Sequence, residues 1–109
     1  MCYPAQEKRR HPRFPHRCPL SFVRLDRLNI GETEDLSLGG MKIRSRHILI
    51  VGETYQFTVV MDGRVITPTG RIVYLEDQPE FSYGAGVSFL RLTKDHKNRL
   101  SRFLSDSRS

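Results

Sequence analysis

The sequence has few cysteines and no long hydrophobic run, and both absences limit what the chain does. Its two cysteines, Cys2 and Cys18, form neither a CxxC pair nor a disulfide framework, and Cys18 opens an apolar run in which we expect it to be buried. No apolar stretch is longer than Ile48–Val51, which is far shorter than the roughly 20 residues of a membrane-spanning helix. The N-terminus also lacks the apolar core of a secretory signal. We therefore expect no membrane span and a cytoplasmic location.

Patterns for metal binding and catalysis are also missing. The four histidines, His11, His16, His47 and His96, are not spaced like metal ligands, and no carboxylate cluster or CxxC accompanies them. There is no GxxxxGK[ST] phosphate loop, and nothing in the sequence places Ser37 in a Ser-His-Asp triad. We therefore expect neither a metal site nor an enzymatic activity.

What the sequence does contain is a globular composition with an uneven charge. Its 109 residues, 38% hydrophobic and 28% charged, fit one domain with a modest core. Residues 1–17 hold five basic residues and one acidic residue, residues 91–109 hold six and two, and residues 18–90 hold seven and nine. A protein that grips long nucleic acid more often spreads positive charge over the body of its fold. The distribution favours a short anionic ligand held by one terminal segment and disfavours long nucleic acid.

The pattern along the chain predicts a basic arm followed by strands. Pro4, Pro12 and Pro15 forbid a regular helix or a central strand, so residues 1–16 are predicted to form a flexible basic arm. Apolar alternation then predicts strands over residues 18–25, 29–35, 41–44, 55–61, 64–74 and 83–92.

Several residues refine these predicted strands. Ile30 is the apolar residue of the second strand, and Asp62-Gly63 indicates a type I′ hairpin because both of its central positions need positive φ. Pro68 implies an edge or a bulge in the returning strand, and Gly84 and Gly86 suggest a bulge or a close backbone approach in the last one. The strand aromatics are expected in the core rather than in a base-stacking platform: Phe22, Phe57, Tyr74 and Phe89.

The end of the chain changes to a helical period. Thr93 is a suitable N-cap, and the following apolar face predicts a helix that ends near Ser105. That face consists of His96, Leu100, Phe103 and Leu104. The predicted fold is all-β: a six-stranded antiparallel β-barrel with an N-terminal basic arm and one C-terminal α-helix. The domain boundaries are then an arm over residues 1–16, a barrel with its helix over 17–105, and a tail over 106–109.

Two motifs have a chemistry suited to an anionic guanine nucleotide. Arg9 and Arg13 form RxxxR, and a guanidinium donates two hydrogen bonds to guanine O6 and N7 or to a phosphate. Asp35, Ser37 and Gly40 form DxSxxG, in which the carboxylate accepts from guanine N–H groups, the hydroxyl donates to phosphate, and the glycine admits a close backbone approach. Each motif alone has an ordinary explanation, a basic tail or a strand-joining turn. Their joint occurrence is the stronger indication.

The two motifs in this order resemble the PilZ domain family of cyclic-di-GMP receptors. The resemblance runs from about Glu7 to about Leu104 and includes the "EKRRHPR" opening, "DLSLGGM" and the late "GAGVSFL" strand. It implies that the ligand is cyclic-di-GMP, without any other cofactor, and that Arg9 and Arg13 close over a barrel wall formed by Asp35, Ser37 and Gly40. Auxiliary candidates are Lys8, Arg10, Gly39 and Arg44. Of these, Lys8 occupies a position at which the family varies, and the resemblance implies that it influences whether one nucleotide or a stacked pair binds. Arg10 and Arg44 also fit ordinary surface charges.

Three functions are compatible with these residues. The first is a bacterial, stand-alone receptor that orders its arm on cyclic-di-GMP and signals to an unidentified downstream protein. The second is a PilZ-like adaptor that binds proteins with weak or no nucleotide affinity. The third, a small barrel that binds single-stranded nucleic acid, follows only from the overall basicity and is opposed by the slightly acidic middle of the chain. We expect the first.

Overall fold

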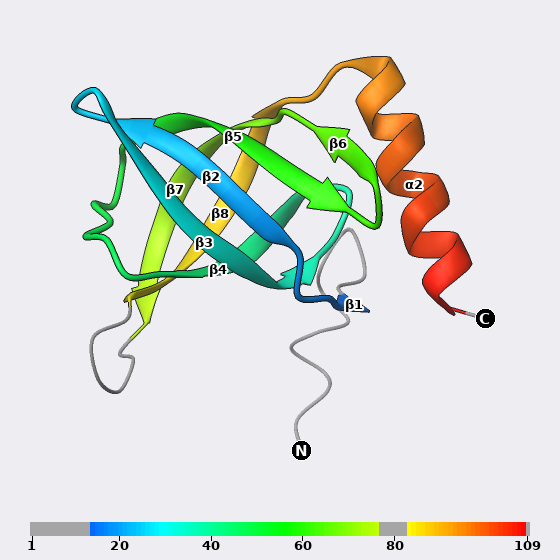
Figure 1. The fold of residues 1–109 in the computed structure, drawn as a ribbon, viewed down its shortest axis with the longest axis horizontal. Helices are drawn as coiled ribbons and strands as arrows, with labels where there is room; N and C mark the ends of the chain where they lie inside the picture. Colours follow the sequence, from blue (N-terminus) through cyan, green and yellow to red (C-terminus); the bar gives the residue numbers. More distant parts are fainter. Residues whose placement is uncertain (1–13, 77–82, 109) are drawn as a thin grey trace.

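The computed structural model describes residues 14–76 and 83–108, and this part of the chain forms strands followed by a helix (Figure 1). In chain order the strands are β1 (Phe14–Pro15), β2 (Pro19–Arg24), β3 (Arg27–Leu36), β4 (Gly40–Ser45), β5 (Thr54–Met61), β6 (Arg64–Ile66), β7 (Thr69–Glu76) and β8 (Tyr83–Arg91). The helix, α2 (Lys94–Arg108), follows β8 and stands beside one end of the sheet (Figure 1).

Six of the strands form a closed antiparallel barrel. The hydrogen-bonded order is β3-β2-β5-β7-β8-β4, and a further pairing of β3 with β4 closes the ring. β6 adds to β5 through a short hairpin, and β1 pairs with the last two residues of β3, beyond the stretch that β2 covers. The predicted six-stranded antiparallel barrel with one C-terminal helix is confirmed. The predicted arm, residues 1–16, falls mostly outside the described residues.

The alternation that predicts the strands also builds the core. Along β5 every second side chain is buried, including Phe57 and Val59. Phe22 of β2 packs against Phe57 with ring centroids 5.3 Å apart, and each such buried side chain contributes roughly 1.5–3 kcal/mol to folding. Cys18 belongs to the same core, as predicted, and burial raises the pKa of its thiol.

The chain reverses at the predicted hairpin and then breaks at the predicted proline. Asp62 and Gly63 have φ values of 52° and 85°, which confirms the pair of positive φ angles that a type I′ turn requires. The returning strand is interrupted around Pro68, which separates β6 from β7. The carbonyl oxygen of Pro68 still accepts a hydrogen bond from the N–H of Phe57 at 2.9 Å. One predicted strand is therefore two, and both pair with β5.

Two strand residues face the opposite way from the sequence pattern. Tyr74, expected in the core, is 39% exposed, because the pairing of β7 with β8 shifts register between Ile72 and Tyr74. Its ring covers Gly86, where a Cβ would lie 2.1 Å from a ring carbon, so the predicted close approach at this glycine is confirmed. In β3, Ile30 is 63% exposed and Asn29 is buried. A change of phase by one residue exchanges the two faces of a strand.

Helix α2 begins and packs as its sequence predicts. The Oγ1 of Thr93 accepts a hydrogen bond from the N–H of His96 at 3.1 Å, which confirms the cap. The imidazole Nδ1 of His96 accepts from the N–H of Thr67 at 3.1 Å and so joins the helix to the connection between β6 and β7. The buried face consists of Leu100 and Leu104, with His96 and Phe103 partly buried. The helix continues to Arg108, past the predicted end near Ser105.

Candidate binding site at the β3–β4 turn

The turn between β3 and β4 is closed by the side chain of Ser37. Its Oγ accepts hydrogen bonds from the backbone N–H groups of Gly39 at 3.2 Å and Gly40 at 3.1 Å, and it donates to the carbonyl oxygen of Gly40 at 3.2 Å. The N–H of Ser37 donates to the same carbonyl oxygen at 2.9 Å. Ser37 is only 3% exposed. Its hydroxyl therefore holds the turn together, a common role of serine between strands.

Gly40, the last residue of DxSxxG, begins β4 where the structure admits no side chain. It pairs with Ser88 of β8, and a Cβ at this position would lie 2.2 Å from the carbonyl oxygen of Val87. The carbonyl oxygen of Gly39 meets the same strand by accepting a hydrogen bond from the N–H of Phe89 at 2.9 Å. The two glycines of the motif thus allow β4 to close against β8.

Asp35 stands at a β-bulge near the end of β3. Thr33 pairs with Ile43 and Asp35 pairs with Lys42, so Glu34 is the extra residue of the bulge. One carboxylate oxygen of Asp35 accepts a hydrogen bond from the N–H of Lys42 at 3.1 Å, which anchors the side chain to β4. Both Glu34 and Asp35 are partly exposed. The bulge therefore places two neighbouring, partly exposed carboxylates beside the turn.

The first described residues of the chain run along this bulge. In β1, Pro15 is opposite Asp35 and Phe14 is opposite Leu36. The root of the N-terminal segment therefore lies against the residues that lead into the turn.

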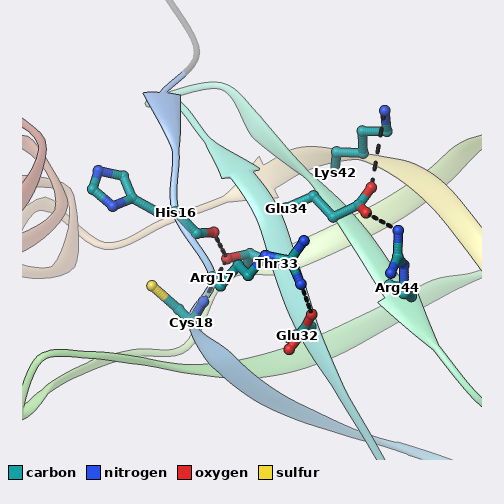
Figure 2. A network of polar contacts seen from close by, with 8 residues as sticks. All are labelled: His16, Arg17, Cys18, Glu32, Thr33, Glu34, Lys42 and Arg44. Carbon is teal, nitrogen blue, oxygen red and sulfur yellow. Dashed lines mark hydrogen bonds and ion pairs between the residues drawn. The ribbon is translucent and has the colours of Figure 1, made fainter.

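Thr33 fastens the residues that follow β1. Its buried hydroxyl donates to the carbonyl oxygen of His16 and accepts from the N–H of Cys18 at 2.9 Å (Figure 2). The N–H of His16 donates to the carbonyl oxygen of Glu34 at 3.2 Å, and the N–H of Thr33 donates to the carbonyl oxygen of Cys18 at 2.9 Å. Leaving a buried polar group without its partner costs about 1–3 kcal/mol, so this set of bonds holds the root of the arm in one place.

A chain of ion pairs crosses the outer surface next to the bulge. Glu34 pairs with Arg44, and the Nζ of Lys42 lies 3.9 Å from Glu34 (Figure 2) and 3.0 Å from Glu76. The hydrogen bond to Glu76 raises the pKa of Lys42. The Nε of Arg44 is buried and has no hydrogen-bond partner among the described residues. The positive charges on β4 are thus matched by carboxylates of β3 and β7.

The structure brings some of the predicted site residues together and places one apart. Asp35 near the end of β3 and Gly40 at the start of β4 flank the turn that holds Ser37 and Gly39. Arg44 lies farther along β4 in its ion pair with Glu34. The remaining predicted residues lie outside the described residues: Lys8, Arg9, Arg10 and Arg13.

Three features of this region are missed by the sequence-based prediction. Thr33 looks like an ordinary strand residue, since threonine is common in strands, and Glu34 has no mark of a bulge residue. Pro15 argues against a strand, although a proline is tolerated at the edge of a sheet. Only the density of polar residues in the stretch 32–35 distinguishes this part of the second predicted strand.

The described residues hold neither a cluster of metal-ligating side chains nor a membrane-spanning helix. Within residues 14–76 and 83–108, no three side chains of histidine, cysteine, aspartate or glutamate are gathered as metal ligands would be. The described helix is neither long enough nor apolar enough to cross a bilayer. The β3–β4 turn itself offers a carboxylate acceptor next to the root of a basic segment.

Comparison with known proteins identifies the family and the fold. The PilZ domain family model matches residues 7–106, and no curated protein matches the sequence. The PilZ domain of YcgR from Escherichia coli, solved with c-di-GMP (cyclic-di-GMP), is similar with a TM-score of 0.78 and 19% identity, over 93% of this chain and 92% of that chain. The PilZ domain of CeSA from a cellulose-synthesizing bacterium has a TM-score of 0.59 and 18% identity, over 89% and 98%.

A longer neighbour shares the same barrel. The inhibitor of motility MotI/DgrA from Bacillus subtilis has a TM-score of 0.79 at 10% identity, over 93% of this chain and 51% of that chain. This chain thus spans about half the length of that neighbour. The similar structures agree on a barrel over nearly the whole chain, and the family model covers the RxxxR and DxSxxG motifs together. The chain belongs to the PilZ domain family.

Proposed function

We propose that this chain is a cytoplasmic receptor that binds cyclic-di-GMP between its N-terminal arm and the β3–β4 turn and then signals to a partner protein. The single observation that carries the proposal is the register of β1, which sets Pro15 opposite Asp35 and Phe14 opposite Leu36. Adjacent Cα atoms are about 3.8 Å apart. Phe14, opposite Leu36, directly follows Arg13, the last residue of RxxxR, in the sequence.

The proposed contacts follow from the donors and acceptors of the motifs. Arg9 and Arg13, which lie outside the described residues, donate to guanine O6 and N7 and to phosphate. Asp35 accepts from the N1–H and N2–H₂ groups of guanine. Ser37 and Gly40 act by shaping the turn, since the hydroxyl bonds within it and the glycine fits against β8. The auxiliary candidates are Lys8 and Arg10 on the arm and Gly39 and Arg44 on the barrel.

The proposed output is an ordering step rather than a reaction. PilZ domains are receptor domains, and the proposal assigns no chemistry to this one. The arm ahead of its fixed root at Phe14 and Pro15 folds over the barrel when the nucleotide binds and presents a new surface to a partner. The ligand of the YcgR structure is c-di-GMP, which supports the choice of nucleotide.

Isothermal titration calorimetry tests the proposal. Wild-type protein should bind cyclic-di-GMP saturably, and Arg9→Ala or Asp35→Ala should weaken binding about tenfold or more, because a hydrogen bond to a charged group contributes about 1.5–3 kcal/mol. Asp35→Asn keeps an oxygen that accepts from the N–H of Lys42, so it separates loss of the carboxylate charge from loss of the fold. Arg27→Ala, at the start of β3, is the matched control and should bind like the wild type.

One observation favours the adaptor function as the second candidate. Ser37 and Gly40 are explained by the turn and by the packing of β4 against β8, so a DxSxxG motif would persist in a barrel that no longer binds nucleotide. Absence of heat with folded wild-type protein would establish this alternative. Equal heats for the wild type, Arg9→Ala and Asp35→Asn would contradict the proposed site while leaving nucleotide binding intact.

A further inference from the structure

A groove separates the β5–β6 hairpin from helix α2. It is open to solvent, has a volume of about 690 Å³, and is lined by residues 63–65 of the hairpin and by Asp95, Asn98, Arg99 and Arg102 of the helix. Its size falls within the roughly 300–1,000 Å³ of typical ligand clefts. Figure 1 shows β6 and α2 side by side at the end of the molecule opposite the β2–β3 turn. We call this feature the β6–α2 groove.

The arginines of the β6–α2 groove fall into two kinds. Arg99 serves the fold, because its guanidinium donates to the carbonyl oxygen of Val65 at 2.9 Å and pairs with Asp95 at 3.1 Å. Arg64 and Arg102 are exposed, and within residues 14–76 and 83–108 neither makes a hydrogen bond or an ion pair. The groove therefore presents two uncompensated guanidinium groups, one from each wall.

The rest of the lining decides which anion fits. The side chain of Asn98 adds an amide that both donates and accepts, and Val65, 37% exposed, adds an apolar contact. Among the described residues that line the groove there is no aromatic ring on which a base could stack. The guanidinium groups of Arg64 and Arg102 lie beside an amide and an apolar side chain. This arrangement suits the separated carboxylates of a peptide better than it suits nucleic acid.

We propose that the β6–α2 groove is a docking site for an acidic peptide segment of a partner protein, with one carboxylate bound by Arg64 and another by Arg102. This site is distinct from the β3–β4 turn. It identifies the chemistry of the partner to which the receptor signals, and only that link to signalling rests on the proposed function.

The helix that forms one wall of the groove also touches the root of the arm. The imidazole of His16 lies against the ring of Phe103 with centroids 4.8 Å apart, and Phe103 is adjacent in sequence to Arg102. The root of the arm thus packs against the helix that carries Arg102. We expect this contact to couple the two sites, so that each ligand changes the affinity for the other.

Fluorescence anisotropy with a fluorescein-labelled Glu/Gly decapeptide tests the docking site. Wild-type protein should bind the peptide saturably, and the double variant Arg64→Glu/Arg102→Glu should bind it at least about tenfold more weakly, because each reversal replaces an attraction by a repulsion. Arg27→Glu/Arg71→Glu is the matched control. It makes the same change of net charge on β3 and β7, outside the groove, and should keep most of the affinity.

Each other outcome overturns the proposal. If the groove variant and the control lose equal affinity for the peptide, the peptide is attracted by the net charge of the protein alone. No binding by the wild type, or displacement of the peptide by a lower concentration of an oligo(U) RNA than of unlabelled peptide, would exclude a peptide site. Calorimetry with cyclic-di-GMP on the same groove variant should match the wild type. If the protein binds cyclic-di-GMP but not the peptide, only the docking site is overturned. If it binds the peptide but not cyclic-di-GMP, only the proposed receptor function is overturned.

Discussion

In the β3–β4 turn, the hydroxyl of Ser37 bonds to the backbone of the turn itself, and the position of Gly40 is filled by the backbone of β8. In the β6–α2 groove, by contrast, the guanidinium groups of Arg64 and Arg102 are exposed to solvent and have no described partner. A motif visible in the sequence can therefore be largely a folding device. Residues that contribute little to the fold are the better indication of a surface kept for another molecule.

The largest expected effect is that of Gly40→Ala. A Cβ placed 2.2 Å from the carbonyl oxygen of Val87 forces β4 away from β8, which should cost about 3 kcal/mol and lower Tm by more than about 10 °C in a domain of this size. Thermal unfolding followed by circular dichroism measures it. Gly63→Ala is the control, since its Cβ meets nothing within 4 Å and only its positive φ should cost about 1 kcal/mol. A smaller loss at Gly40 than at Gly63 would contradict the comparison.

An intermediate effect is expected for Ser37→Ala. The variant removes the acceptor of the N–H groups of Gly39 and Gly40 in a buried turn, so the free energy of unfolding should fall by about 1–3 kcal/mol. Urea denaturation measures the change. Ser101→Ala, on the exposed face of α2, should stay within about 0.5 kcal/mol. If Ser37→Ala unfolds with the same free energy as the wild type, the hydroxyl does not stabilise the turn and is available to a ligand.

The smallest effects are expected in the groove. Arg64→Ala and Arg102→Ala should each change the free energy of unfolding by less than about 0.5 kcal/mol, because neither residue has a described partner to lose. Arg99→Ala removes the hydrogen bond to Val65 and the ion pair with Asp95 and should cost about 1 kcal/mol. Urea denaturation measures the free energy of unfolding of the three variants. Equal decreases for all three would contradict the division into an arginine that stabilises the fold and two that do not.

Most of the fold follows from local patterns in the sequence. The alternation of β5, the Asp62-Gly63 hairpin and the Thr93 cap each depend on a few neighbouring residues, and all three are confirmed. The errors arise where a distant strand decides. Tyr74 turns outward because β7 slips against β8, and the phase of β3 is set by its partners rather than by its single isoleucine, Ile30.

In the candidate site, too, features formed by neighbouring residues are predictable and features formed by distant residues are not. Asp35, Ser37 and Gly40 are found from the sequence because the turn that they form is contiguous. The pairing of Pro15 with Asp35 is not predictable, since it joins residues that are twenty positions apart across an edge that a proline disfavours. The β6–α2 groove has no sequence signature for a related reason, since a hairpin and a helix some thirty residues apart form it together.

The closure of β3 on β4 has a further consequence for the behaviour of the domain in concentrated solution. A sheet with exposed edges can recruit strands from other chains and aggregate. In residues 14–76 and 83–108 the ring of six strands has no open edge, and the strands outside it, β1 and β6, are two and three residues long. The carbonyl oxygen of Val65 in β6 is already occupied by Arg99. The same arginine that forms a wall of the groove thus protects the barrel against strand-by-strand self-association.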